Sequence, residues 1–165
     1  MSVALIDYGA GNLHSVHNAL VTAGGKDVRI TADPEFVAQA ERIVLPGVGA
    51  FGACRDALYA LPGMVEAMHN AAITRGAPFL GICVGMQLLA ERGEEFGSHT
   101  GLGWIPGVVR LIAPADDTIK VPHMGWNDVT PALPHSLIET GEAYFLHIYH
   151  FDAVDPADVI ATTEH

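Results

Sequence analysis

The sequence has few cysteines, few basic residues and no long apolar run, and each shortage excludes a class of protein. Its 165 residues include two cysteines, Cys54 and Cys83, which are too few for a disulfide framework. We therefore expect reduced thiols and a cytoplasmic location. Eight Lys and Arg against 19 Asp and Glu give a net charge of −11, so nucleic acid and anionic membrane surfaces are poor partners. No stretch reaches the roughly 18 charge-free apolar residues of a membrane span. Because Asp7 interrupts the first apolar run, we also expect no signal peptide.

The composition is that of one globular domain. Half of the residues are hydrophobic and 16% are charged, which excludes a disordered chain. The 18 glycines and 10 prolines follow no period, and the chain shows neither an internal repeat nor a linker. We therefore predict a single domain over residues 1–165.

The hydrophobic pattern predicts an α/β fold. Short β-rich runs alternate with helical patterns over the first part of the chain, which is typical of a parallel sheet with helices on both faces. After about Gly103, strand-like runs are joined by turns, which indicates an antiparallel extension. The expected strands are 3–7, 27–31, 42–47, 78–83, 103–112, 121–129, 142–151 and 158–165, and the expected helices are 11–25, 32–40, 54–72 and 84–93.

The segment "GICVG", residues 81–85, has the pattern of a nucleophile elbow with cysteine in place of serine. A sharp strand-to-helix turn would expose Cys83, and the glycines on either side would avoid collisions with neighbouring backbone. The start of a helix favours the thiolate, and the amide of Val84 would point to where an oxyanion forms. A lone cysteine is more often a buried core residue. The flanking glycines and the strand-to-helix context favour the nucleophile here.

A second glycine-rich loop, "LPGVGAFG", follows the third expected strand. By itself it is an ordinary strand-to-helix turn. In a doubly wound sheet, however, this loop and the elbow both lie at carboxyl ends of strands, where ligand sites form. The loop could then bring a second oxyanion donor within reach of Cys83.

Other motifs point to no cofactor and no metal. "DYGAGN" lacks the third glycine of a dinucleotide fingerprint, because position 14 is His14. The nine histidines show no H-E-x-x-H or H-x-x-x-H pattern, so we expect no metal. In "VPHMGWNDV", Trp126 fits a core position and a partner surface equally well.

Four segments together resemble one known family. "GICVGMQLL" is similar to the nucleophile motif of class I (triad) glutamine amidotransferases, and "DYGAGNLHSV", "LPGVGAFG" and "VPHMGWN" also resemble members of this family. The resemblance extends from about residue 6 to residue 163. It implies a flavodoxin-like fold with a central, mostly parallel sheet, and a glutaminase without cofactor that supplies ammonia to a synthase.

The resemblance also implies roles for particular residues. Cys83 would attack the side-chain amide of L-glutamine, release ammonia and form a glutamyl thioester that water hydrolyses. The amide of Val84 would be one oxyanion donor, and the strand of Gly47, Val48 and Gly49 would supply the other after a peptide flip near Val48. The residues that would hold the glutamine are Gln87, Ile148 and Tyr149.

The implied partner is a (β/α)8-barrel synthase subunit, which would form a heterodimer with this chain and receive the ammonia. Asn12, Ser15, Trp126 and Asn127 match positions at that interface. In this family, glutaminase activity depends on the synthase subunit and its nucleotide ligand. The isolated chain should therefore have almost no glutaminase activity.

The sequence departs from the family pattern in two ways. Ile148 stands where a serine or threonine is usual, so glutamine affinity should drop if that hydroxyl is used. The catalytic histidine and glutamate of a "Q-F-H-P-E"-type turn are absent, and neither His123 nor His135 has a glutamate two residues later. We expect that the chain lacks a C-terminal segment carrying this base, which would limit its own activity.

Two alternatives remain open. The chain could be the glutaminase subunit of an ammonia-dependent synthase other than the barrel synthase described above, although "GAGN" and "GWN" argue against this. It could also be a module without activity that only docks on the barrel subunit.

Overall fold

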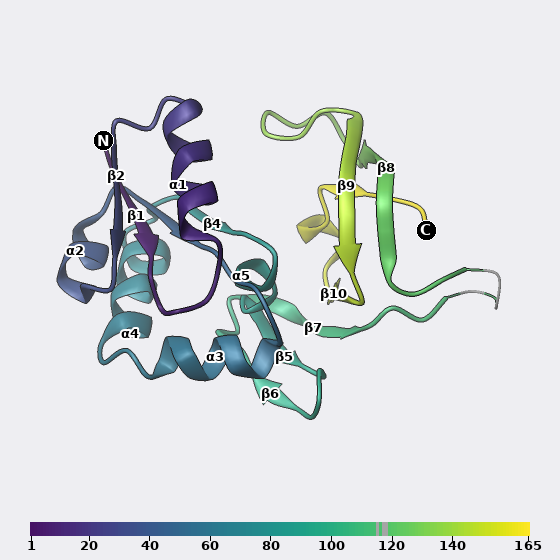
Figure 1. Cartoon of the computed structure of the whole chain (residues 1–165), viewed down its shortest axis with the longest axis horizontal. Helices are drawn as coiled ribbons and strands as arrows, with labels where there is room; N and C mark the ends of the chain where they lie inside the picture. Colours follow the sequence, from purple (N-terminus) through teal and green to yellow (C-terminus); the bar gives the residue numbers. More distant parts are fainter. Residues whose placement is uncertain (115, 117–118) are drawn as a thin grey trace. The chain divides into compact units, whose positions relative to one another are not determined.

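The computed structural model describes residues 1–114, 116 and 119–165 (Figure 1). The chain forms two compact units, Met1–Leu89 and Ala90–His165. Among the described residues, no helix combines the length and apolar character needed to cross a bilayer.

The first unit is built on a parallel sheet of four strands in the order β2-β1-β3-β4. Residues on β1 alternate between the two faces of the sheet, and four of its five side chains are buried. Such a doubly covered strand is typical of a parallel sheet with helices on both sides. The predicted α/β architecture is confirmed. The strands are β1 (Ser2–Ile6), β2 (Asp27–Thr31), β3 (Arg42–Leu45) and β4 (Phe79–Gly81).

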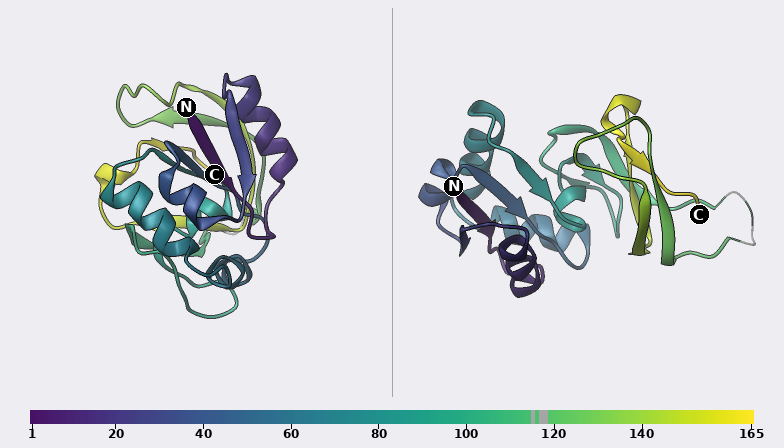
Figure 2. Two further views of the ribbon diagram at one scale, coloured as in Figure 1. Left: turned by 90° about the vertical axis from the view of Figure 1, so that its left-hand side faces the viewer. Right: turned by 90° about the horizontal axis from the view of Figure 1, so that it is seen from above.

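Helices cover both faces of this sheet because the strand order reverses direction at β1. The crossover from β1 to β2 through α1 (Leu13–Thr22) runs one way, and the later crossovers run the other way. Figure 2 shows α1 opposite α2 (Pro34–Gln39) and α4 (Met64–His69). On the α1 face, the buried side chains of Val3, Leu5 and Val44 pack against Leu13, Val16 and Leu20.

Local signals set the start of α2 but not the length of the next helix. The Asp33 side chain accepts a hydrogen bond from the Glu35 amide at 2.9 Å, with Pro34 at the first helical position. The expected single helix over 54–72 is wrong. Pro62 and Gly63 divide it into α3 (Phe51–Tyr59) and α4, followed by the π-helix η1 (Asn70–Thr74), and Gly63 takes a φ of 77°.

The helix after the cysteine is also shorter than the expected 84–93. The helix α5 covers only Val84–Gln87, and residues 90–93 form the strand β5 (Ala90–Gly93) instead. This strand pairs in parallel with β7 (Ile105–Leu111), with Ala90 opposite Ile105. Pairing with β7 therefore overrides the helical propensity of the segment.

The second unit consists of two small sheets, in the orders β10-β7-β5-β6 and β11-β8-β9. The antiparallel pairs β8–β9 and β10–β7 confirm the predicted extension. The expected strand over 142–151 divides at Ile148, because its two halves pair with different strands. The expected last strand over 158–165 is reduced to Ala161–Thr162. The bounds are β6 (His99–Thr100), β8 (His123–Pro131), β9 (Gly141–His147), β10 (Tyr149–Ala153), the 3-10 helix η2 (Pro156–Asp158) and β11 (Ala161–Thr162).

Candidate active site

Cys83 lies at a sharp turn between β4 and α5, which is the strand-turn-helix arrangement expected from the sequence. Its backbone has φ 55° and ψ −120°. Phe96 is the only other non-glycine residue with positive φ in the described part of the chain. Such a conformation costs a residue with a side chain on the order of 1 kcal/mol and is concentrated at functional sites. The thiol of Cys83 is exposed, so the strained turn presents it to solvent.

The glycines on either side of Cys83 are required by close backbone contacts. A Cβ at Gly81 would lie 2.6 Å from the Cα of Met86. A Cβ at Gly85 would overlap the carbonyl oxygen of Leu45, at the end of β3. The predicted steric reason for both glycines is therefore confirmed, and α5 can begin directly against β3.

Val84 follows the cysteine, and its side chain is buried. Its carbonyl accepts a hydrogen bond from the amide of Leu88 at 2.9 Å. Within the described residues, the amide N–H of Val84 donates to no protein acceptor. An N–H next to an exposed thiol, without an acceptor of its own, can donate to the oxyanion of a tetrahedral intermediate bonded to that sulfur.

The loop after β3 lies directly against the elbow, as the topology predicts. The amide of Ile82 donates to the carbonyl of Leu45 at 2.9 Å. A Cβ at Gly47 would lie only 2.5 Å from the amide nitrogen of Gly85. Gly49 has a φ of 106° and open space around it, while the side chain of Val48 is exposed. The backbones of the two glycine-rich segments are therefore in direct contact.

Two residues that sequence reasoning did not single out hold this loop. The hydroxyl of Tyr8 donates to the carbonyl of Pro46 at 2.6 Å, and the thiol of Cys54 donates to the carbonyl of Val48 at 3.3 Å. Burial raises the pKa of Tyr8 above its usual range, and the neighbouring Cys54 and Cys83 raise it further, so the hydroxyl stays protonated. The only signal in the sequence was the position of Tyr8 after the carboxyl end of β1.

Gln87 ends α5, one turn after the cysteine. Its amide donates to the carbonyl of Cys83 at 3.1 Å, and its side chain is half-buried. The two residues therefore lie on the same side of the short helix.

Ile148 and Tyr149 belong to the second unit. Ile148 lies between β9 and β10, and its carbonyl accepts a hydrogen bond from the amide of Ile112 at 2.9 Å. In the described part of the chain its own amide has no protein acceptor. Tyr149 begins β10, and its carbonyl lies 3.0 Å from Nδ1 of His147.

Of the four expected interface residues, two in each unit, Asn12, Ser15 and Trp126 are exposed and Asn127 is half-buried. Asn12 caps α1 by accepting a hydrogen bond from the amide of Ser15 at 3.2 Å. Trp126 is 71% exposed on β8, so the core interpretation of this tryptophan is wrong. Its ring meets that of Tyr144 edge to face, with 5.8 Å between the ring centroids. The side chain of Asn127 lies within hydrogen-bond distance of His123 Nε2 and of the carbonyl of Glu164.

His123 is the one buried polar residue of the second unit among those described. Its Nδ1 lies 3.0 Å from His147 Nε2, and its ring stacks on Phe145 and His165. Burial lowers the pKa of His123, and the neighbouring His165 and His147 lower it further. The described residues contain no cluster of His, Cys, Asp or Glu with the geometry of a metal site.

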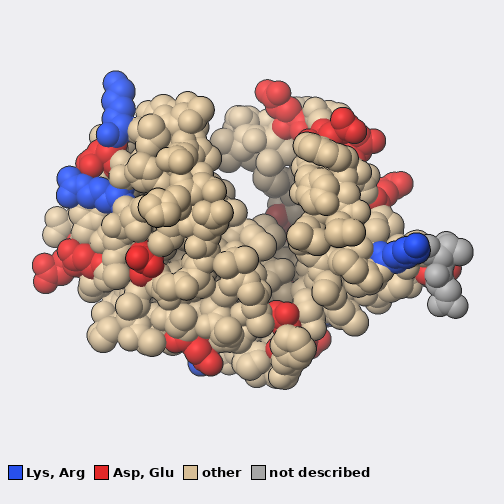
Figure 3. Space-filling model, viewed as in Figure 1, with Lys and Arg blue, Asp and Glu red and all other residues tan. Residues whose placement is uncertain are grey.

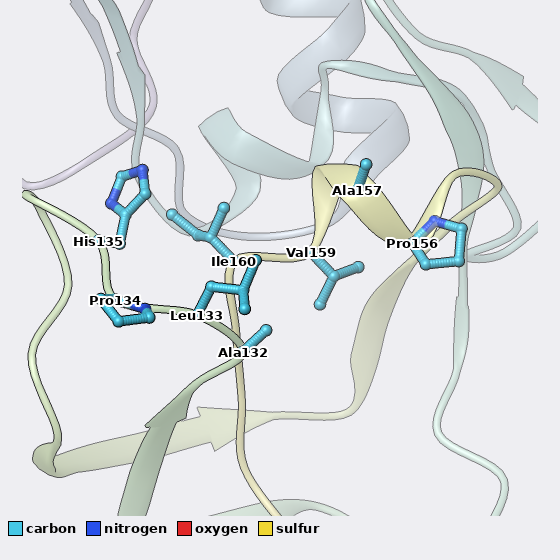
Figure 4. Close-up of a pocket in the computed structure, with 8 residues that line it drawn as sticks. All are labelled: Ala132, Leu133, Pro134, His135, Pro156, Ala157, Val159 and Ile160. Atoms are coloured by element: carbon cyan, nitrogen blue, oxygen red, sulfur yellow. The ribbon is translucent and has the colours of Figure 1, made fainter.

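An apolar pocket of about 410 Å³ opens in the second unit (Figure 4). Only one of its lining residues, His135, can titrate, and this residue lies in a loop outside the regular strands. Its lining residues therefore include no cysteine and no hydroxyl side chain that could act as a nucleophile. Its lining residues are Ala132, Leu133, Pro134, His135, Pro156, Ala157, Val159 and Ile160.

One face of the molecule shows no basic patch among the described residues. On the face shown in Figure 3, acidic side chains are scattered, and Lys and Arg form no continuous area. This distribution agrees with the net charge of −11, which does not favour a polyanionic partner.

Comparisons with known proteins give one consistent result. The family model described as "Glutamine amidotransferase class-I" matches residues 4–165. The chain is 56% identical to "Imidazole glycerol phosphate synthase subunit HisH" of Zymomonas mobilis, over 99% of this chain and 78% of the relative. It is 53% identical to the protein of the same name from Rhodospirillum rubrum, over 100% of this chain and 82% of the relative.

A solved structure shares the fold. "Structure of PurLQS from Thermotoga maritima" contains a chain that matches with a TM-score of 0.68. The match covers 98% of this chain and 74% of that one, at 17% identity. At this identity the likeness concerns the fold alone.

Proposed function

The chain belongs to the class I glutamine amidotransferase family, and from this premise we propose that it is the glutaminase subunit of an imidazole glycerol phosphate synthase. The observation that carries the proposal is the exposed Cys83 at a strained elbow, beside the unengaged amide of Val84. The relatives at 56% and 53% identity support the choice of this subunit within the family. The segments 9–12 and 123–127 support the same choice, because they resemble this subunit more than those of other synthases.

Cys83 would begin the reaction by adding its sulfur to the side-chain amide carbon of glutamine. The carbonyl oxygen then becomes an oxyanion, and the C–N bond breaks as the nitrogen takes up the proton that the Cys83 thiol has lost and leaves as ammonia. Water attacks the resulting glutamyl thioester, which releases glutamate and restores the thiol. Each step passes through a tetrahedral oxyanion, so donors fixed beside Cys83 would lower both barriers.

Val84 and the loop of Gly47, Val48 and Gly49 would supply those donors. The amide of Val84 is suited to this role because it has no protein acceptor within the described residues. The loop is suited because its backbone approaches the elbow at Gly47. In the proposed mechanism, one peptide of this loop turns to bring a second N–H to the oxyanion.

Gln87, Ile148 and Tyr149 would hold the substrate glutamine. At position 148 the isoleucine has no hydroxyl to offer, but its amide N–H is unengaged within the described residues. A main-chain contact with the substrate would make the side chain at this position tolerable. We therefore assign the contact at Ile148 to the backbone.

The proposed partner is the (β/α)8-barrel synthase subunit, in a heterodimer that passes ammonia directly to the second active site. Cross-strand pairing places Met124 and Trp126 of β8 beside Leu146 and Tyr144 of β9, and all four side chains are exposed. A contiguous apolar face of this kind is typical of a partner surface. With Asn12, Ser15 and Asn127, this face would form the interface. The two free cysteines fit the cytoplasm, where such a biosynthetic enzyme would act.

Labelling with a diazoketone analogue of glutamine tests this proposal, because the analogue alkylates a thiol only when it occupies a glutamine site. We expect labelling of Cys83, located by peptide mass spectrometry, to rise when the barrel subunit and its nucleotide ligand are added. Buried Cys54 serves as the internal control and should stay unlabelled. If iodoacetamide alkylates Cys83 but the analogue does not under any condition, the chain is a docking module.

A further inference from the structure

Two side chains hold alternate carbonyls of the loop after β3. The Tyr8 hydroxyl donates to the Pro46 carbonyl at 2.6 Å, and the Cys54 thiol donates to the Val48 carbonyl at 3.3 Å. Tyr8 is 5% exposed and Cys54 is 1% exposed, so water does not compete for either bond. The peptides Pro46–Gly47 and Val48–Gly49 are therefore both fixed.

The peptide between them is not fixed. Within the described residues, neither the Gly47 carbonyl nor the Val48 amide has a hydrogen-bond partner. Because a peptide unit is planar, it can rotate about the line joining its two Cα atoms by changing only ψ of the first residue and φ of the second. The Gly47–Val48 peptide can thus turn while the carbonyls on both sides stay in place.

Gly47 is the residue that makes this rotation possible. A Cβ at this position would lie 2.5 Å from the Gly85 nitrogen and 2.9 Å from the Tyr8 hydroxyl oxygen. The tight fit fixes where Gly47 sits, and the missing side chain leaves its ψ free. The rotating N–H belongs to Val48, and the residue about which it rotates, Gly47, lies against Gly85 of the elbow.

This inference rests on the proposed glutaminase function. We propose that Tyr8 and Cys54 are positioning residues of the oxyanion hole. By fixing the Pro46 and Val48 carbonyls, they confine the flip to the Gly47–Val48 peptide. The flipped peptide then directs the Val48 N–H to the oxyanion of the intermediate bonded to Cys83. Without either bond, the neighbouring peptides also move, and the Val48 N–H spends less time in the donating position.

The two bonds differ in strength, which predicts different effects. A hydroxyl is a strong donor, whereas a thiol is a weak one. Tyr8→Phe, which deletes only the hydroxyl, should therefore have the larger effect. Cys54→Ser replaces the weak donor by a stronger one and should preserve function, while Cys54→Ala should not.

The test compares two labels on Cys83 in the complex with the barrel subunit. Iodoacetamide needs only an accessible thiol, whereas the diazoketone analogue of glutamine also needs an oxyanion donor. We expect the ratio of the two labelling rates, analogue over iodoacetamide, to fall about tenfold in Tyr8→Phe, less than the loss seen when an oxyanion donor itself is removed. It should fall a few-fold in Cys54→Ala and return in Cys54→Ser. Tyr59→Phe on α3 is the matched control and should leave the ratio unchanged.

A purely structural role would change both labelling rates by the same factor, and that result would overturn the proposal. A ratio that stays low in Cys54→Ser would overturn it as well, because the serine hydroxyl still donates.

Backbone NMR of the free chain tests the same inference without any substrate. In the wild type, relaxation dispersion on the μs–ms timescale should affect the Val48 amide and leave the Gly49 amide flat. In Cys54→Ala, the Gly49 amide should also show dispersion, and identical profiles in the two proteins contradict the inference. If the analogue fails to label even the wild type, the glutaminase proposal fails, and the dispersion profiles still decide the roles of Tyr8 and Cys54.

Discussion

The backbones of Leu45 and Gly85 meet so closely that a Cβ at Gly85 would overlap the Leu45 carbonyl oxygen. The same carbonyl accepts the hydrogen bond from the amide of Ile82 on the other side of Cys83. The end of β3 therefore fixes the turn that carries the cysteine. Packing of this kind, rather than a side-chain interaction, positions the candidate nucleophile.

Gly85→Ala should therefore destabilise the protein by about 2–4 kcal/mol, because the added methyl group meets backbone that cannot move aside. Urea unfolding measures the effect. Gly141→Ala is the matched control, since a Cβ at Gly141 meets nothing within 4 Å, and it should change stability by less than about 0.5 kcal/mol. Equal effects of the two substitutions would show that the Leu45 contact does not constrain the elbow.

The strained backbone of Cys83 predicts a difference between two substitutions that both remove the thiol. Cys83→Gly should be more stable than Cys83→Ala by about 1 kcal/mol, because glycine adopts a φ of 55° without strain. Both variants should lose labelling by the glutamine analogue. A Cys83→Ala variant as stable as Cys83→Gly would mean that the turn stores no strain.

Trp126→Ala should weaken binding of the barrel subunit while leaving the fold nearly intact. The ring is 71% exposed and contacts Tyr144 at its edge, so the stability loss should stay within about 1 kcal/mol. A central interface tryptophan contributes roughly 2 kcal/mol or more, so the Kd, measured by calorimetry, should rise about 30-fold. Leu137→Ala, at an exposed apolar residue outside the β8–β9 pair, is the control. Similar affinities of the two variants would place the interface elsewhere.

Stability should fall in mild acid because His123 is easier to protonate in the unfolded chain. Burial lowers the pKa of His123 in the folded state. Its contribution to the free energy of unfolding is therefore complete above the unfolded pKa of about 6.5. The contribution is lost as the pH falls through that value towards the lower folded pKa. Urea unfolding between about pH 7.5 and pH 5.5 should show a steeper loss for the wild type than for His123→Gln. Parallel curves would contradict this origin.

The sequence predicted those features of the fold and site that depend on local pattern and strand order. The parallel strands and the approach of the 45–52 loop to the elbow both follow from such signals. The end of α5 was missed because pairing of β5 with β7 overrides helix propensity. Tyr8 and Cys54 were missed because a residue that binds a distant carbonyl looks like any core residue in the sequence. Such bonds depend on loop conformation, which no spacing encodes.

The central claim is that Cys83 lies in a glutamine site, and substrate protection tests it most directly. In the complex with the barrel subunit and its nucleotide ligand, the rate of Cys83 alkylation by iodoacetamide is followed while glutamine is raised. Asparagine, which is one methylene shorter, serves as the control. The account predicts that glutamine slows alkylation of Cys83 to a saturating limit and that asparagine does not. Alkylation at the same rate in the presence of glutamine would contradict it.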